Sequence, residues 1–188
     1  MSVDSIESSD SECLESLYLM PGELTFTECP TLVATVLGSC VAVTFYNKRL
    51  QLGAICHAVF PWSQGKDNFK FVDSSLCYML ECFSVRRVSR KDIVAKLFGG
   101  ADMFESLSSE RRGKTVGWQN VLVAREELQR HGVRLHTQDV GGEQGRRLVF
   151  NTQNGEVYLK RLRRADCRIT SEKQPDNWLP CFMTPSTE

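Results

Sequence analysis

Three short apolar runs follow one another between residues 31 and 60, and this stretch constrains the fold more than any other. The runs are rich in β-branched and aromatic residues and cover residues 31–37, 41–46 and 52–60. Gly38-Ser39 separates the first two runs, Asn47-Lys48 begins a turn after the second, and Pro61 stops the third. Runs of this length, bounded by turn residues, are typical of β-strands. The sequence therefore predicts three consecutive strands.

Helical and extended patterns alternate in the rest of the chain. Apolar residues at positions 76, 79, 80 and 83 have helical spacing, which predicts a helix over residues 75–87. A second helix is expected over residues 118–131, with Gly132 as its stop. Further strands are expected over residues 93–98, 133–137, 147–150 and 156–162, the last two joined by the turn residues Asn154-Gly155. We therefore predict an α+β fold with a mixed sheet.

Length and composition fit one globular domain between two tails. A chain of 188 residues with 41% apolar content can bury a substantial core. Residues 1–16 are acidic and serine-rich and are expected to form a disordered tail. We expect residues 17–164 to form the domain and residues 165–188 to form a C-terminal tail or extension.

Charge and hydropathy argue against several classes of protein. Residues 1–47 contain seven Asp and Glu and no Lys or Arg, whereas residues 48–188 contain 16 acidic and 23 basic residues. The basic residues occur as short pairs without an aromatic platform, so no nucleic-acid binding is expected. No stretch approaches the roughly 18 apolar residues of a membrane span, and the N-terminus lacks the pattern of a secretory signal. We expect a cytoplasmic protein without membrane insertion.

The eight cysteines have no spacing that indicates a metal site. No C-x-x-C motif is present, and Cys77 and Cys82 are five residues apart. We therefore expect no structural metal, and the cytoplasm keeps thiols reduced. The pairs Gly99-Gly100 and Gly141-Gly142 lack the lysine of a phosphate loop and are expected to make tight turns at strand ends.

Cys40 and His57 are the residues in the apolar stretch that could carry chemistry. A hairpin turn centred near residue 49 would place His57 roughly opposite Val41, next to Cys40 at one end of the sheet. An imidazole can accept the thiol proton, which creates the nucleophilic thiolate, and can later protonate a leaving group. Backbone N–H groups near Gly38 and Ser39 could hold an oxyanion.

Spacing alone leaves an ordinary structural alternative open. Free cysteine is among the most often buried residues, and a buried histidine often has only a hydrogen-bonding role. Cys56, beside His57, is a rival thiol, but it points to the opposite face of its strand and follows no glycine turn. The other six cysteines are expected to be core or incidental residues.

Five longer motifs follow one another along the chain. They are LGSCVAV (37–43), GAICHAVFP (53–61), AKLFGGADMF (95–104), GWQN (117–120) and DVGGEQGRRLVFNTQNGEV (139–157). Together they resemble the chemoreceptor glutamine deamidase family, CheD, and their order and spacing follow the family over roughly residues 18–162. Several motifs in order are far more specific than any one of them.

The resemblance implies a fold, an activity and partners. Members of the family are cytoplasmic cysteine hydrolases that need no cofactor. They convert glutamine side chains on the cytoplasmic helices of chemotaxis receptors to glutamate, with release of ammonia. The implied fold is a β-sheet sandwich with flanking helices, similar to the catalytic domain of toxin deamidases. Cys40 matches the family's nucleophile and His57 its general base, and a CheC-type phosphatase is a second expected partner.

One departure from the family concerns the residue that orients the histidine. The family commonly has a threonine six residues before the cysteine, where this chain has Ala34. Thr35 is adjacent, but in a regular strand it faces the other way, so a bulge or a shifted register is expected to bring it into the site. Ser39, a water molecule or a backbone carbonyl are the alternatives for orienting His57.

Two further functions stay open at this stage. The domain could be a weakly active or non-catalytic binding module for chemoreceptors and a CheC-type phosphatase, which the Ala34 departure suggests. It could also be a redox sensor, in which several of the cysteines would react with an oxidant.

Overall fold

The computed structural model describes residues 14–63, 65, 68–102 and 115–162. The strands within these ranges are β1 (Glu15–Tyr18), β2 (Leu24–Thr27), β3 (Thr31–Leu37), β4 (Val41–Asn47), β5 (Leu52–Ala58), β6 (Val94–Gly99), β7 (Leu135–Val140), β8 (Arg146–Asn151) and β9 (Val157–Arg161). The helices are α1 (Val72–Val85) and α2 (Val116–Arg130), with a short 3₁₀ turn, η1 (Arg90–Asp92), between α1 and β6.

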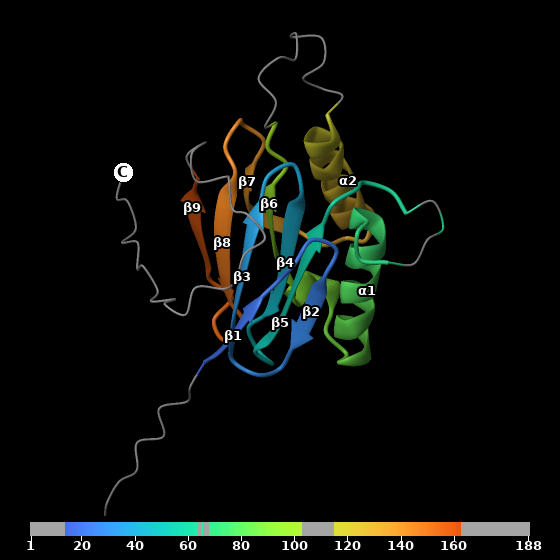
Figure 1. Cartoon of the computed structure of the whole chain (residues 1–188). Helices are drawn as coiled ribbons and strands as arrows, with labels where there is room; N and C mark the ends of the chain where they lie inside the picture. Colours follow the sequence, from blue (N-terminus) through green and yellow to red (C-terminus); the bar gives the residue numbers. More distant parts are fainter. Residues whose placement is uncertain (1–13, 64, 66–67, 103–114, 163–188) are drawn as a thin grey trace, which may run out of the picture.

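Two sheets face each other, and both helices cover the outer face of the second one (Figure 1). The first sheet has the strand order β1-β3-β8-β9, and the second has the order β2-β5-β4-β6-β7. The pairs β1–β3 and β6–β7 are parallel and the remaining pairs are antiparallel. The predicted α+β fold, a mixed-sheet sandwich with flanking helices, is confirmed.

The two faces of the second sheet belong to two different cores. Alternate residues of β4 and β5, such as Val43 and Cys56, pack toward α1 and α2. The residues between them, such as Ala42 and Ile55, pack toward the first sheet. Every residue of β4 and β5 is buried. Burial on both faces explains why the sequence shows continuous apolar runs here instead of alternation.

The predicted strands from residue 31 onward are present, with shifted ends. β3 has the predicted bounds, and the hairpin of β8 and β9 turns at Asn154-Gly155, where Gly155 has a φ of 76°. The helices begin two or three residues earlier than predicted. The sequence reasoning missed β1 and β2, although Pro21-Gly22 is a turn signal and the apolar–polar alternation of residues 24–27 is a strand signal.

The predicted tails lie almost wholly outside the described residues. The first strand includes Glu15 and Ser16, which the sequence had assigned to the N-terminal tail. Residues 1–13 and 163–188, with Cys13, Cys167 and Cys181, lie outside the described ranges. Within those ranges, neither helix is long and apolar enough to cross a membrane.

Candidate active site

Cys40 lies where the chain crosses from one sheet to the other. β3 ends at Leu37 in the first sheet and β4 begins at Val41 in the second, so residues 38–40 form the crossing. The predicted break at Gly38-Ser39 is therefore a change of sheet. Cys40 is partly buried and packs against the core between the two sheets.

His57 lies on the same face of the second sheet as Cys40. The hairpin of β4 and β5 pairs Ala42 with His57 and Val41 with Ala58. The predicted pairing of His57 with Val41 is therefore wrong by one residue, because the loop holds four residues between Asn47 and Leu52. The correct register matters, since directly opposite residues share a face and Cys40 shares the face of Ala42. Cys40 is then the same-face neighbour of His57 at the end of the sheet.

Thr35 reaches His57 from the opposite sheet. The Thr35 hydroxyl lies 2.8 Å from His57 Nδ1 and donates a hydrogen bond of 2.8 Å to the Leu19 carbonyl. A hydroxyl has one proton, and Leu19 takes it, so Thr35 accepts from an N–H at Nδ1. That proton position leaves a lone pair on His57 Nε2, a buried atom with no hydrogen-bond partner among the described residues. In this tautomer Nε2 is the ring nitrogen that can accept a proton.

Thr35 reaches the site without any distortion of β3. Its strand pairs with β8 in unbroken register from Leu32 to Leu37. Val33 and Leu37, which share the face of Thr35, belong to the core between the sheets. The expectation that a bulge or register shift would be needed is therefore wrong: in a regular strand Thr35 faces the second sheet, and Ala34 faces away from it.

Burial leaves both partners uncharged in the substrate-free protein. Burial lowers the pKa of His57 to about 4, against smaller raising effects of the Leu19 carbonyl and Glu23. Burial also raises the pKa of the Cys40 thiol, against a smaller lowering effect of its own backbone N–H. A thiol and a neutral imidazole therefore face a substrate at neutral pH, and a preformed thiolate–imidazolium pair does not.

Hydrogen bonds from two segments, the loop after β6 and the helix α2, fix the backbone around Cys40. The N–H of Ala101 donates to the Gly38 carbonyl at 2.8 Å. The N–H of Gly100 donates to the Cys40 carbonyl at 2.8 Å. The buried side-chain amide of Asn120, on α2, donates to the Ser39 carbonyl at 3.1 Å and to the Val59 carbonyl at 2.9 Å. Asn120 thus joins the segment that carries Cys40 to the end of the strand that carries His57.

Glycine is required where the loop after β6 meets Cys40. Gly99 has a φ of 105°, and a Cβ there would lie 2.2 Å from the Cys40 carbonyl oxygen. At Gly100, with a φ of 65°, a Cβ would lie 2.8 Å from the carbonyl oxygen of Gly117 on α2. Gly141 donates its N–H to the Gly99 carbonyl at 2.9 Å. Both glycine pairs lie at strand ends near the site, as predicted. Close backbone contact is the physical reason at Gly99 and Gly100, whereas at Gly141 and Gly142 the reason is a positive φ of 72° and 71°.

The segment between β1 and β2 holds His57 from the other side, and sequence reasoning missed it. Gly22 donates to the His57 carbonyl at 2.7 Å, and the His57 N–H donates to the Glu23 carbonyl at 2.9 Å. The Leu19 carbonyl of the same segment accepts the hydrogen bond from Thr35, which contacts the His57 ring. The segment therefore fixes the His57 backbone directly and the His57 ring through Thr35. Cys56 lies on the opposite face of β5 from His57, as predicted; this face packs against the helices, and Cys56 is fully buried.

The fold and the site together define a class of protein. It is an α+β domain in which a cysteine, at a crossing between two sheets, shares one sheet face with a buried histidine held by a threonine. The chain matches the family described as CheD chemotactic sensory transduction over residues 58–161.

Named relatives match most of the chain. A Geobacter sulfurreducens protein named probable chemoreceptor glutamine deamidase CheD 2 is 46% identical over 153 residues, which is 81% of this chain and 94% of that protein. Probable chemoreceptor glutamine deamidases CheD of Nitratidesulfovibrio vulgaris and Thermococcus kodakarensis are 38% and 37% identical, over 84% and 67% of this chain and 83% and 80% of theirs. This chain belongs to the CheD family.

A solved structure is a more distant match. The hypothetical protein YfiH of Bacillus licheniformis superposes with a TM-score of 0.42 at 18% sequence identity, over 62% of this chain and 49% of that one.

Proposed function

We propose that this protein is a chemoreceptor glutamine deamidase in which Cys40 is the nucleophile, His57 the general base and acid, and Thr35 the residue that orients His57. The observation that carries the proposal is the pair of hydrogen bonds at Thr35, to His57 Nδ1 and to the Leu19 carbonyl. They leave Nε2 free to take a proton on the face of the sheet that carries Cys40.

The first half of the reaction forms a thioester. His57 Nε2 takes the thiol proton as the Cys40 sulfur attacks the side-chain amide carbon of a glutamine. A hydrogen bond from the backbone N–H of Cys40 lowers the pKa of its own thiol, against the larger raising effect of burial. We assign this N–H, with the N–H groups near Gly38 and Ser39, as donors to the oxyanion of the tetrahedral intermediate. His57 then gives its proton to the amide nitrogen, the carbon–nitrogen bond breaks and ammonia leaves.

The second half hydrolyses the thioester. His57, neutral again, takes a proton from a water molecule that attacks the thioester carbon. The carbon–sulfur bond breaks, and the proton on His57 returns to the sulfur. The net change is the conversion of glutamine and water to glutamate and ammonia, with Cys40 and His57 restored. Because both groups are neutral before substrate binds, proton transfer accompanies attack.

The substrate is proposed to be the cytoplasmic helices of a chemoreceptor, as the names of the relatives suggest. Large exposed apolar side chains follow β5 and lie near the start of α2: Phe60, Trp62 and Trp118. They neighbour Val59 and Asn120, which are tied to the Cys40 segment. Exposed aromatic residues beside a site favour a macromolecular substrate. A CheC-type phosphatase partner and a cytoplasmic location, where Cys40 stays reduced, complete the proposal.

The experiment compares two cysteine variants on a purified receptor fragment. Mass spectrometry follows the conversion of glutamine to glutamate by the wild type, Cys40→Ala and the control Cys82→Ala, which changes a partly buried cysteine on α1. We expect conversion by the wild type and the control, and none by Cys40→Ala. Conversion by Cys40→Ala at the wild-type rate would refute the mechanism. An inactive wild type that still captures the receptor fragment would favour the binding-module alternative.

A further inference from the structure

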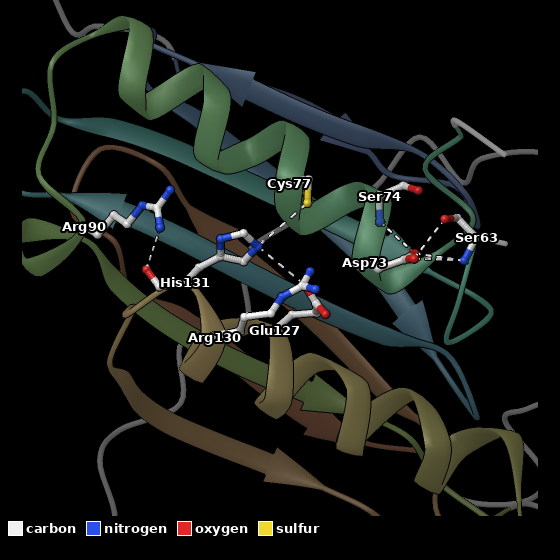
Figure 2. Close-up of polar contacts among 8 residues, drawn as sticks. All are labelled: Ser63, Asp73, Ser74, Cys77, Arg90, Glu127, Arg130 and His131. Atoms are coloured by element: carbon white, nitrogen blue, oxygen red, sulfur yellow. Dashed lines mark hydrogen bonds and ion pairs between the residues drawn. The ribbon is translucent and has the colours of Figure 1, made fainter. Parts of the chain in front are cut away.

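A second cluster of reactive side chains lies between the two helices, on the far side of the second sheet from His57 (Figure 2). Cys77 projects from α1, and Glu127 and His131 come from the end of α2. Cys77 Sγ lies 3.8 Å from His131 Nε2, and His131 Nε2 lies 3.4 Å from Glu127 Oε2. All three ligand atoms lie within 4.8 Å of one another.

We propose that Cys77, Glu127 and His131 bind a zinc ion that joins α1 to α2. Thiolate, imidazole and carboxylate are the three side-chain ligands that zinc takes. With zinc bonds of about 2.0–2.3 Å in a tetrahedron, neighbouring ligand atoms are about 3.4–3.6 Å apart. The two measured separations, 3.4 and 3.8 Å, are close to these edges. Three protein ligands leave a fourth position for water or another ligand.

The ligands are held in place before any ion binds. Glu127 and His131 are four residues apart, so they share one face of the helix end. Gly132, with a φ of 68°, and Val133 end the helix with N–H bonds to the carbonyls of Gln129 and Leu128, the pattern of a Schellman motif. The His131 carbonyl also accepts a hydrogen bond of 3.0 Å from Arg90. Zinc binding therefore costs little conformational entropy at this site.

The charges around the cluster favour a cation. Glu127 is a carboxylate with only 2% of its side chain exposed, and its charge is partly offset by an ion pair with Arg130. Arg130 contacts Oε2, the same oxygen that lies 3.4 Å from His131 Nε2, and because the Arg130 side chain is largely exposed it can move away when a metal takes that oxygen. A divalent cation in this position stabilises the thiolate form of Cys77 directly.

The ordinary alternative is an ion-pair network that ends α2. Glu127 would then form ion pairs with Arg130 and His131, and Cys77 would only pack at the contact between the helices. That alternative gives no role to the thiol, whereas the zinc site needs all three groups. It also differs in its response to metal, since an ion-pair network binds no cobalt or zinc.

The test uses the full chain, freed of metal by a chelator, in a Cys40→Ala background that removes the rival Cys–His pair. Cobalt is the probe, because tetrahedral coordination and a thiolate ligand both give characteristic absorption. We expect these bands in Cys40→Ala, their retention with added Cys82→Ser, and their loss with added Cys77→Ser. Zinc should displace the cobalt, and magnesium should not, because it prefers oxygen ligands.

A second variant guards against misfolding. His131→Gln keeps the helix end and removes one ligand, and we expect it to weaken zinc affinity at least about tenfold. Zinc should also raise the thermal midpoint of Cys40→Ala and leave that of the Cys77→Ser double variant unchanged. The proposal is overturned if Cys40→Ala binds neither metal, or if Cys77→Ser and His131→Gln both bind zinc as tightly as their parent. These measurements involve no receptor substrate, so their result is independent of the deamidase proposal.

Discussion

Replacing Thr35 with valine tests the proposal that Thr35 orients His57 as a general base. Valine has nearly the shape of threonine, so the packing of β3 against the second sheet is kept. The change removes the acceptor for the His57 Nδ1 proton and the donor to the Leu19 carbonyl, both 2.8 Å from the hydroxyl. Both groups become buried and unpaired.

The structure gives a magnitude for each effect. An unpaired buried polar group costs about 1–3 kcal/mol, so two of them should lower the free energy of unfolding by about 2–6 kcal/mol. For activity, the hydrogen bond from His57 Nδ1 to Thr35, which keeps the ring proton on Nδ1, contributes about 0.5–1.5 kcal/mol. Since about 1.4 kcal/mol corresponds to tenfold in rate, we expect kcat/KM to fall roughly two- to twelvefold in Thr35→Val.

The assay measures ammonia release from a receptor fragment, together with denaturant unfolding of each variant. Thr35→Ser keeps the hydroxyl and should have nearly wild-type activity. Thr44→Val changes another buried threonine, on β4, and should leave kcat/KM nearly unchanged. A folded Thr35→Val enzyme with wild-type kcat/KM would refute the role given to Thr35.

Three further predictions concern the groups around the site. Gly99→Ala places a Cβ 2.2 Å from the Cys40 carbonyl oxygen, so it should abolish activity and lower the free energy of unfolding by more than about 3 kcal/mol. Gly132→Ala is the control: a Cβ there meets open space, so the free energy of unfolding should fall by only about 1–2 kcal/mol. Denaturant unfolding compares the two variants. Asn120→Leu leaves two backbone carbonyls without a donor and should lower the free energy of unfolding by about 2–3 kcal/mol and reduce kcat, measured by unfolding and ammonia release. His57, with a pKa of about 4 in the folded protein, takes up its proton first in the unfolded chain, so its share of stability falls as the pH drops from 6.5 toward 4. Between about pH 7.5 and 5 the wild type should lose about 2 kcal/mol more than His57→Asn, and equal losses would contradict the burial of a neutral imidazole.

The strands could be predicted from sequence because their signals are local. Apolar runs, turn residues and the Asn154-Gly155 dipeptide depend on neighbours a few positions away, and β3 has the predicted bounds. The assignment of strands to sheets could not be predicted in this way. Nothing local shows that the chain changes sheet at residues 38–40, which is the step that places β3 opposite β5.

Dependence on local signals also decides which site residues could be predicted from the sequence. His57 lies in the hairpin of β4 and β5, and Cys40 directly precedes β4. Sequence spacing could therefore predict that the two residues are close, with an error of one residue in the strand register. Thr35 meets His57 across two sheets, and its face depends on the sheet packing. Asn120 lies on a distant helix, and its two bonds to backbone carbonyls have no sequence signature.

The metal cluster shows the limit most clearly. Cys77 is separated from His131 by more than fifty residues, and no spacing rule for zinc ligands covers such a pair. The ligands come together because α1 and α2 pack side by side on the sheet (Figure 1).

The most direct test of the central claim is to trap the covalent intermediate. A receptor fragment is mixed with the wild-type enzyme, the reaction is quenched with acid, and the enzyme is digested and mapped by mass spectrometry. We predict a thioester between Cys40 and the glutamyl side chain, sensitive to hydroxylamine. An adduct on a different residue, or continued turnover by Cys40→Ala, would contradict the claim that Cys40 is the nucleophile.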